Sequence, residues 1–247
     1  MQKAFTALAL SAIVGAVAVL AGTVDSGATA PSGSSTTVRT TLDPADFSHP
    51  VMNPWFPLEP GTTTLLRGTD GAERFREQVR VTDRTRVIQG VDTRVVRDVL
   101  RRADGSLAEA TTDWYAADNA GNVWYFGEKT ATYDRHGHVQ SREGTWRAGV
   151  DGAVAGLIMP SDPKATDAYR QEFYAGHAED QAWIVGYKAS VRVPMRRFHH
   201  VLRTFEWSRL EPGVMSTKLY AVGVGIVREQ DVAGGHESFE VVAVRHR

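Results

Sequence analysis

The chain has 247 residues, of which 28 are Lys or Arg and 29 are Asp or Glu, so its formal net charge is −1. A balanced chain without a basic block offers no electrostatic attraction to nucleic acid, which excludes that class of partner. The sequence contains no cysteine, which excludes disulfides, thiol catalysis and lipid attachment through an N-terminal cysteine.

The first thirty residues have the features of a secretory signal peptide. A weakly basic start, Met1–Lys3, precedes an apolar run from Ala4 to Leu20, and small residues end at Ala28-Thr29-Ala30. This A-x-A pattern predicts cleavage after Ala30. An uncleaved N-terminal anchor is the alternative, but the apolar run is short for a membrane span and lacks a basic flank. We therefore expect a protein secreted or held at the cell-envelope exterior, with no membrane span after cleavage.

Two segments separate the signal peptide from the strands. Residues 31–43 are rich in Ser and Thr and lack apolar periodicity, which predicts a flexible tether ahead of one β-rich domain over residues 44–247. Residues 49–61 then carry four prolines around Trp55, Phe56 and Leu58. Because proline is excluded from helix interiors and central strands, we expect this Pro-rich segment to cover an open edge or end of a sheet.

From Thr62 onward, short β-branched and aromatic runs alternate with turn residues, and no segment keeps a helical period over three turns. We expect strands at 62–67, 74–81, 85–88, 93–101, 107–115, 123–133, 139–146, 169–174, 190–194, 198–207, 216–221, 225–230 and 238–244, with 181–187 as a strand or one short helix. A Gly/Pro-rich stretch near residues 148–168 is expected to be a long crossing on the surface. The predicted fold is all-β, an antiparallel meander that closes as a barrel or half-barrel.

We place a hairpin over residues 111–128 at the centre of this sheet, because two aromatic runs flank an Asp/Asn/Gly turn there. Strand alternation puts Asp113 and Tyr115 on one face of the first arm, and Trp124, Phe126 and Glu128 on one face of the second. If both sets lie on one side of the sheet, aromatic rings surround the carboxyls and raise their pKa, an arrangement that also suits carbohydrate rings. The alternative is an aromatic core with both acids at strand ends in water.

The most polar strand is expected at residues 169–180. Alternation puts Arg170, Glu172 and Tyr174 on one face, and Glu179 and Asp180 follow directly. Paired carboxylates of this kind can perform acid–base chemistry or hold a hard cation. The alternative is an outward face with a surface ion pair between Arg170 and Glu172.

Three motifs resemble TapB-like proteins and the related DUF3108 family. They are Phe56-Pro57-Leu58-x-Pro60-Gly61, Ser190-Val-Arg-Val-Pro194 with Phe198, and Tyr220-Ala-Val-Gly-Val-Gly-Ile-Val-Arg-Glu229. The resemblance implies a secreted or periplasmic β-rich fold akin to the half-barrel of lipoprotein carriers, and it assigns no catalytic residues.

Three hypotheses about the function therefore stay open. The first is an exported barrel that binds a small apolar or amphipathic ligand. The second is a secreted hydrolase that acts through Glu172, Asp180 and Asp113. The third is an envelope protein that contacts partners through the Trp55 segment. The candidate ligand-binding residues are Asp113, Tyr115, Trp124, Glu128, Arg170, Glu172, Tyr174, Glu179 and Asp180. We expect no cofactor and no metal, because His136 and His138 alone do not make a zinc site.

Overall fold

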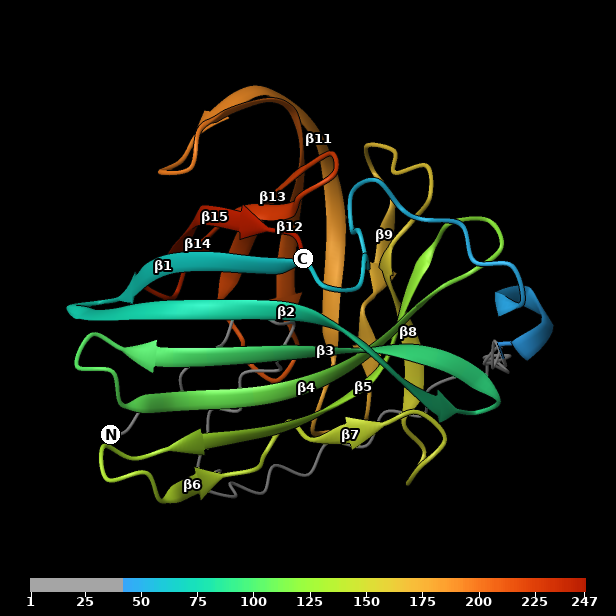
Figure 1. Ribbon diagram of the computed structural model, residues 1–247, viewed down its shortest axis with the longest axis horizontal. Coiled ribbons are helices and arrows are strands. Elements are labelled where there is room, and N and C mark those ends of the chain that lie inside the picture. The colour runs from blue at the N-terminus through green and yellow to red at the C-terminus, as the bar shows by residue number, and fades with distance from the viewer. Residues whose placement is uncertain (1–41) are drawn as a thin grey trace, which may run out of the picture.

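A computed structural model describes residues 42–247 and shows an all-β protein (Figure 1). The strands are β1 (Thr63–Asp70), β2 (Glu73–Ile88), β3 (Val91–Arg102), β4 (Leu107–Ala117), β5 (Val123–Tyr133), β6 (Val139–Ser141), β7 (Trp146–Arg147), β8 (Val154–Met159), β9 (Ala168–Arg170), β10 (Glu172–Phe173), β11 (Asp180–Arg192), β12 (Arg197–Ser208), β13 (Met215–Ala221), β14 (Gly225–Ala233) and β15 (Glu237–Arg245). One 3-10 helix, η1 (Pro44–Phe47), precedes them. The signal peptide and residues 31–41 of the expected tether lie outside the described residues.

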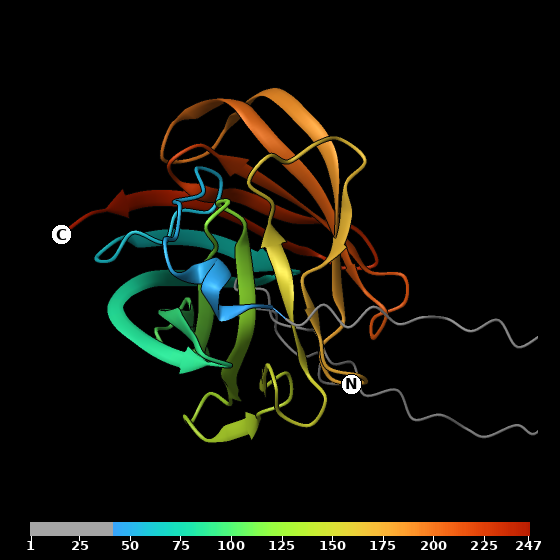
Figure 2. The same cartoon turned by 90° about the vertical axis from the view of Figure 1, so that its right-hand side faces the viewer.

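One antiparallel sheet contains all of these strands, in the order β10-β8-β5-β4-β3-β2-β1-β15-β14-β13-β12-β11-β9, with β6 and β7 paired to β5. The strands β1 to β5 form one meander and β11 to β15 another, and the pairing of β1 with β15 joins the two. The sheet curls on itself so that its second half lies behind the first (Figures 1 and 2). The predicted antiparallel meander and barrel-like closure are confirmed.

The two ends of the sheet meet within one short segment of chain. Strand β9 pairs with β11, and β10, which begins two residues later, pairs with β8. Between them, the Gln171 amide donates to the Asp180 carbonyl across 2.8 Å. The carbonyl of Gln171 also passes so close to Gly156 on β8 that a Cβ there would overlap it. The barrel is nearly closed because the chain changes pairing partner at Gln171.

Several strand boundaries differ from the expected ones. Strand β2 is continuous, with an irregularity between Val81 and Thr85, where two strands were expected. The expected strand at 139–146 divides into β6 and β7, while 181–187 lies within the long strand β11. The Gly/Pro-rich crossing near 148–168 contains β8, whose Ile158 and Met159 are fully buried. Strand β8 pairs with β5 and so belongs to the sheet, which makes the crossing only partly a surface connection.

The Pro-rich segment lies across one end of the barrel, as Figure 2 shows from that side. Asn53 fixes the segment: its Nδ2 donates to the Gly121 carbonyl at 2.8 Å, and its Oδ1 accepts from the Trp55 amide at 2.8 Å. On the other side, the Gly223 amide donates to the Pro54 carbonyl at 2.8 Å. These bonds tie the segment to the β4–β5 turn and to the β13–β14 turn.

The main core lies beneath this segment. Its largest fully buried side chains include Tyr125, Phe126, Ile158 and Tyr220, and Phe47 of η1 packs edge-on against Phe126 at 5.7 Å. Each such apolar side chain contributes about 1.5–3 kcal/mol when it leaves water. Within residues 42–247, no helix is both long and apolar enough to span a membrane.

Candidate functional site

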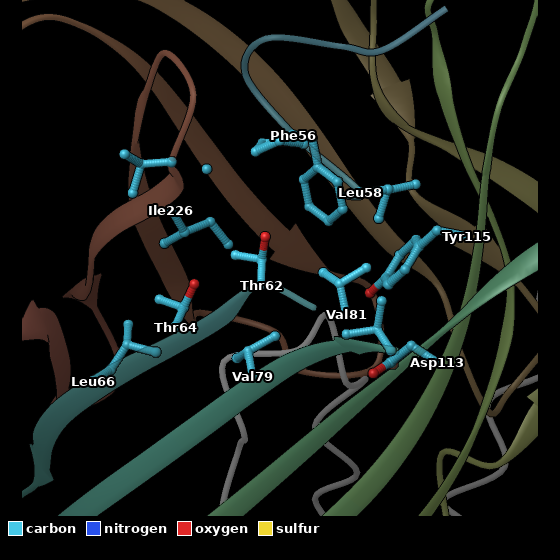
Figure 3. Close-up of a pocket in the computed structure, with 14 residues that line it drawn as sticks. Phe56, Leu58, Thr62, Thr64, Leu66, Val79, Val81, Asp113, Tyr115 and Ile226 are labelled. Carbon is cyan, nitrogen blue, oxygen red and sulfur yellow. The ribbon is translucent and has the colours of Figure 1, made fainter. Parts of the chain in front are cut away.

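A largely apolar cavity of about 90 Å³ lies between the Pro-rich segment and the two halves of the sheet (Figure 3). Strand alternation turns Thr64 and Leu66 of β1, and Val79 and Val81 of β2, toward it. Its complete lining is Phe56, Pro57, Leu58, Thr62, Thr64, Leu66, Val79, Val81, Val96, Asp113, Tyr115, Val224, Gly225 and Ile226. Asp113 supplies the one carboxyl group in this lining, and the other polar side chains are the hydroxyl-bearing Thr62, Thr64 and Tyr115, so the walls are mostly apolar.

The Asp113 side chain is fully buried and held from one side. Its Oδ1 accepts a 2.8 Å hydrogen bond from the Tyr125 hydroxyl, whereas its Oδ2 is buried with no hydrogen-bond partner within the described chain. Burial raises the pKa of Asp113 well above its ordinary value, and Asp98 adds to this, while the Tyr125 bond opposes it. A buried carboxyl oxygen without a partner in the chain can be satisfied by water or by a donor group of a ligand.

A bulge in the central hairpin decides which residues accompany Asp113. Asp113 pairs with Glu128, but Tyr115 pairs with Tyr125, so β5 has one extra residue in this interval. Gly127 occupies the bulge with φ of 125°, where a Cβ would overlap the Trp146 carbonyl oxygen. Because each inserted residue reverses the alternation, Tyr125 joins the side of Asp113.

The expected common face of Trp124, Phe126 and Glu128 is therefore wrong. The Trp124 indole donates instead to the Asp118 carboxylate in the hairpin turn, at 2.9 Å, and its side chain is half-buried. Glu128 remains opposite Asp113 and fully buried. Sequence reasoning missed Tyr125, although a glycine inside a strand is a recognised sign of a bulge.

The polar strand at 169–180 also departs from simple alternation. Glu172 is fully buried, and its Oε2 accepts a 2.8 Å hydrogen bond from the Trp146 indole. Arg170 is exposed, with its guanidinium 4.5 Å above the Phe173 ring. The shared face and the surface ion pair between Arg170 and Glu172 are thus wrong, because the change of partner at Gln171 interrupts the alternation.

The other members of this strand lie near one another but do not line the cavity. The half-buried Tyr174 ring stacks on His177 at 4.5 Å. Glu179 accepts from the Gly176 amide at 2.9 Å and lies 3.6 Å from Arg209. Burial raises the pKa of Asp180 to about 6.

Glu172 is electrostatically linked to both Asp180 and Asp113. Burial raises the pKa of Glu172 well above its ordinary value, and the charges of Asp180 and Asp113 raise it further. The three residues that the hydrolase hypothesis uses therefore share one region of the interior, but Asp113 alone of the three lines the cavity. Glu128 and Tyr174 instead meet in a separate open groove of about 320 Å³, whose walls include Trp114, Trp146 and Arg147.

A second buried polar cluster lies in the other half of the barrel. The Lys218 ammonium is 3.0 Å from Glu206 and 3.6 Å from Glu229. Glu206 also accepts hydrogen bonds from Thr204 at 2.7 Å and Tyr220 at 3.0 Å. Burial lowers the pKa of Lys218, but Glu206 and Glu229 raise it by more. This cluster supplies its own counter-ion, and sequence reasoning missed it because its members come from separate strands.

Carboxyl groups dominate the buried polar residues. The buried acids are Glu77, Asp98, Glu109, Asp113, Asp118, Glu128, Glu172, Glu206 and Glu229, whereas the buried bases are Arg102 and Lys218. Across residues 42–247, no group of three or more His, Asp or Glu side chains is placed to hold a metal ion.

The similarities to known proteins concern the fold. No protein-family model matches the chain, and no curated protein matches its sequence, so the TapB-like and DUF3108 resemblance rests on the short motifs alone. One similar solved structure is a candidate exported protein with a YmcC-like fold from Bacteroides fragilis, with 12% identity and a TM-score of 0.47, covering 77% of this chain and 98% of its own. Another is a candidate lipoprotein from Parabacteroides distasonis, with 10% identity and a TM-score of 0.45, covering 79% of this chain and 100% of its own.

Proposed function

We propose that this protein is exported and binds a small apolar or amphipathic molecule in the cavity beneath Phe56. The observation that carries the proposal is the cavity itself, whose walls are mostly apolar and whose one carboxyl group is Asp113. Small-molecule sites commonly combine such walls with a few polar groups that orient the ligand. One water needs about 10–15 Å³ of the same kind of volume, so about 90 Å³ admits a small ring or a short chain.

The position of the carboxyl groups favours binding over hydrolysis. A pair of catalytic carboxylates must both reach the reacting atoms. Asp113 lines the cavity, whereas Glu172, which accepts from Trp146, and Asp180, which begins β11, do not. A ligand in the cavity therefore meets one of the three acids. Two aromatic rings, Phe56 and Tyr115, lie 5.2 Å apart in its wall and supply apolar contact area.

Benzyl alcohol provides a direct test, because it combines one ring with one hydroxyl. Saturation-transfer NMR on the purified protein should detect its binding. Val224→Trp should weaken this binding at least ten-fold, because Val224 lines the cavity. Val222→Trp is the matched control: it lies in the same turn, is 59% exposed and does not line the cavity. Absence of binding, or equal binding by both variants, would overturn the proposal.

Export is tested separately. Cleavage after Ala30 leaves a chain that begins at Pro31, because Ala28 and Ala30 are the small residues that a signal peptidase accepts. Intact-mass measurement of protein recovered from the culture supernatant or cell envelope should show the loss of residues 1–30. Retention of those residues would mean that the apolar run acts as an anchor.

A further inference from the structure

We propose that the cavity selects a small primary amine, with its ammonium group against the Asp113 carboxyl and its apolar body against Phe56 and Val81. This inference rests on the proposed function, because it names the chemistry of the molecule held in the same cavity. Its starting points are one buried oxygen of Asp113 without a partner in residues 42–247, the acidic groups around it and the buried ammonium of Lys218 elsewhere in the barrel.

Asp113 is presented to the cavity by a fixed aromatic support. The Tyr125 hydroxyl holds Oδ1 at 2.8 Å. The Tyr125 ring stacks on Tyr115 at 4.7 Å with planes 17° apart, and it meets the Trp146 ring edge-on at 5.3 Å. The carboxyl group is thereby oriented, and its Oδ2 remains buried without a partner in residues 42–247. An ammonium group offers three donors and no acceptor, so it can satisfy this oxygen.

The charge around Asp113 favours a cationic head group. After burial itself, the charge of Asp98 raises the pKa of Asp113, and Glu109 contributes in the same direction. The charges that act on the neighbouring Tyr115 come from Asp113, Glu128, Asp98 and Glu172, all of them acidic. A bound ammonium group would stabilise the ionised form of Asp113, which burial and the neighbouring acids disfavour, whereas a carboxylate head group would disfavour that form further.

The same barrel already holds an ammonium in such surroundings. Lys218 is buried, yet its Nζ lies 3.0 Å from Glu206 and 3.6 Å from Glu229, and those two acids keep it charged. Asp113 also has acidic neighbours, Asp98 and Glu109, which are different residues from those around Lys218. A ligand ammonium at Asp113 would therefore make the same kind of charge-assisted hydrogen bond that Lys218 makes to Glu206.

The apolar body of the ligand follows from the rest of the lining. Val79, Val81 and Ile226 face the cavity from two halves of the sheet, and Phe56 and Leu58 close it from the Pro-rich segment (Figure 3). These five side chains are apolar, and the other polar side chains of the lining besides Asp113 are the hydroxyl-bearing Thr62, Thr64 and Tyr115. The volume of about 90 Å³ suits a single ring or short alkyl chain that carries one amine better than a polyamine or a sugar.

Three ligands that share one ring and differ in the head group test the proposal: benzylamine, benzyl alcohol and benzoate. At pH 7, NMR titration of the wild-type protein should show benzylamine binding at least ten-fold more tightly than benzyl alcohol, with benzoate the weakest. Val224→Trp should weaken benzylamine binding at least ten-fold, while Val222→Trp should leave it unchanged. Benzylamine binding that survives Val224→Trp would place the amine at exposed acids and overturn the proposal.

Asp113→Asn removes the charge and preserves the shape of the side chain. It should abolish the preference for benzylamine over benzyl alcohol while benzyl alcohol binding stays within about two-fold of wild type. If this variant does not fold, the ranking of the three ligands on the wild-type protein still decides. Benzyl alcohol binding that depends on Val224, without any preference for the amine, would overturn this inference and leave the proposed function standing. Failure of all three ligands to bind would overturn both.

Discussion

The indole of Trp146 donates a 2.8 Å hydrogen bond to the carboxyl of Glu172, and both side chains are buried inside the barrel. Trp146 belongs to β7, which pairs with β5, and Glu172 begins β10, which pairs with β8. The bond therefore links two short strands on different partners, close to the place where the two ends of the sheet meet. This placement gives Glu172 a structural role beside any part that it has in the electrostatics of the cavity.

Replacement of Glu172 should separate its hydrogen bond from its charge. Glu172→Gln keeps an oxygen for the Trp146 indole, and the amide resembles the protonated acid that burial favours. We expect its free energy of unfolding at pH 5 to lie within about 1 kcal/mol of wild type. Glu172→Ala leaves the buried indole N–H without an acceptor and should cost about 1–3 kcal/mol. Urea denaturation measures both, and equal losses in the two variants would argue against the bond.

Stability should fall as pH rises from about 5 to 9. Burial raises the pKa of Glu77, Asp113 and Glu172 well above their ordinary values, that of Asp180 to about 6, and that of Glu229 to about 8. Because the folded state holds these protons more tightly than the unfolded state, their contribution is fully present below the unfolded pKa, near 4.5 for Glu, and is lost as pH passes each folded pKa.

Urea denaturation across this pH range tests that sign. The free energy of unfolding should be higher at pH 5 than at pH 8. Glu172→Gln should flatten the dependence, because it removes one of the titrating groups without removing the hydrogen-bond acceptor. A wild-type stability that rises from pH 5 to pH 8 would contradict the expected retention of protons by the buried acids.

Lys218 should be essential to the stability of the second polar cluster. Lys218→Met removes the ammonium and leaves Glu206 and Glu229 buried without their counter-ion. Loss of one partner from a buried ion pair costs about 3–5 kcal/mol. Lys188→Met, at an exposed position of β11, is the matched control and should change stability by less than about 1 kcal/mol. Addition of Glu206→Gln and Glu229→Gln to Lys218→Met should recover much of the loss.

The sequence predicts the strands of this barrel far better than it predicts the side-chain partners inside it. Alternation and turn residues locate the strands from β1 to β5 and from β11 to β15, because both signals are set by a few residues that are neighbours in the sequence. They do not locate β8, because its apolar run lies among glycines and prolines. The burial of the acids could not be predicted from the sequence either. Alternation divides the side chains of a strand between two faces, but it does not say which face becomes the interior.

The members of the candidate site could be predicted only in part, because strand alternation does not fix which side chains meet in the interior. Asp113 and Tyr115 line the cavity, and Glu128 lies opposite Asp113. Trp124 and Arg170 point elsewhere, because a bulge and a change of pairing partner each interrupt the alternation that placed them. Both interruptions depend on contacts between segments far apart in the sequence, so no local pattern determines them.

Gly127 should be the most sensitive glycine of the central hairpin. Its φ of 125° disfavours any side chain, and a Cβ would overlap the carbonyl oxygen of Trp146 on the paired strand β7. Gly137→Ala is the matched control, because Gly137 also has a positive φ, of 84°, but a Cβ there meets nothing within 4 Å. The left-handed conformation alone costs about 1–2 kcal/mol, so that is the loss expected at Gly137.

Gly127→Ala should lose at least about 2 kcal/mol more than this control, because the backbone of β7 must move away from β5. That movement would also displace the Trp146 indole from Glu172 and release the Tyr125 ring that it contacts edge-on. Urea denaturation measures the loss, and tryptophan fluorescence should report the displaced indole in Gly127→Ala but not in Gly137→Ala. Equal stability of the two variants would show that the bulge does not set the pairing of Tyr115 with Tyr125. The position of the Tyr125 hydroxyl that donates to Asp113 would then need another explanation.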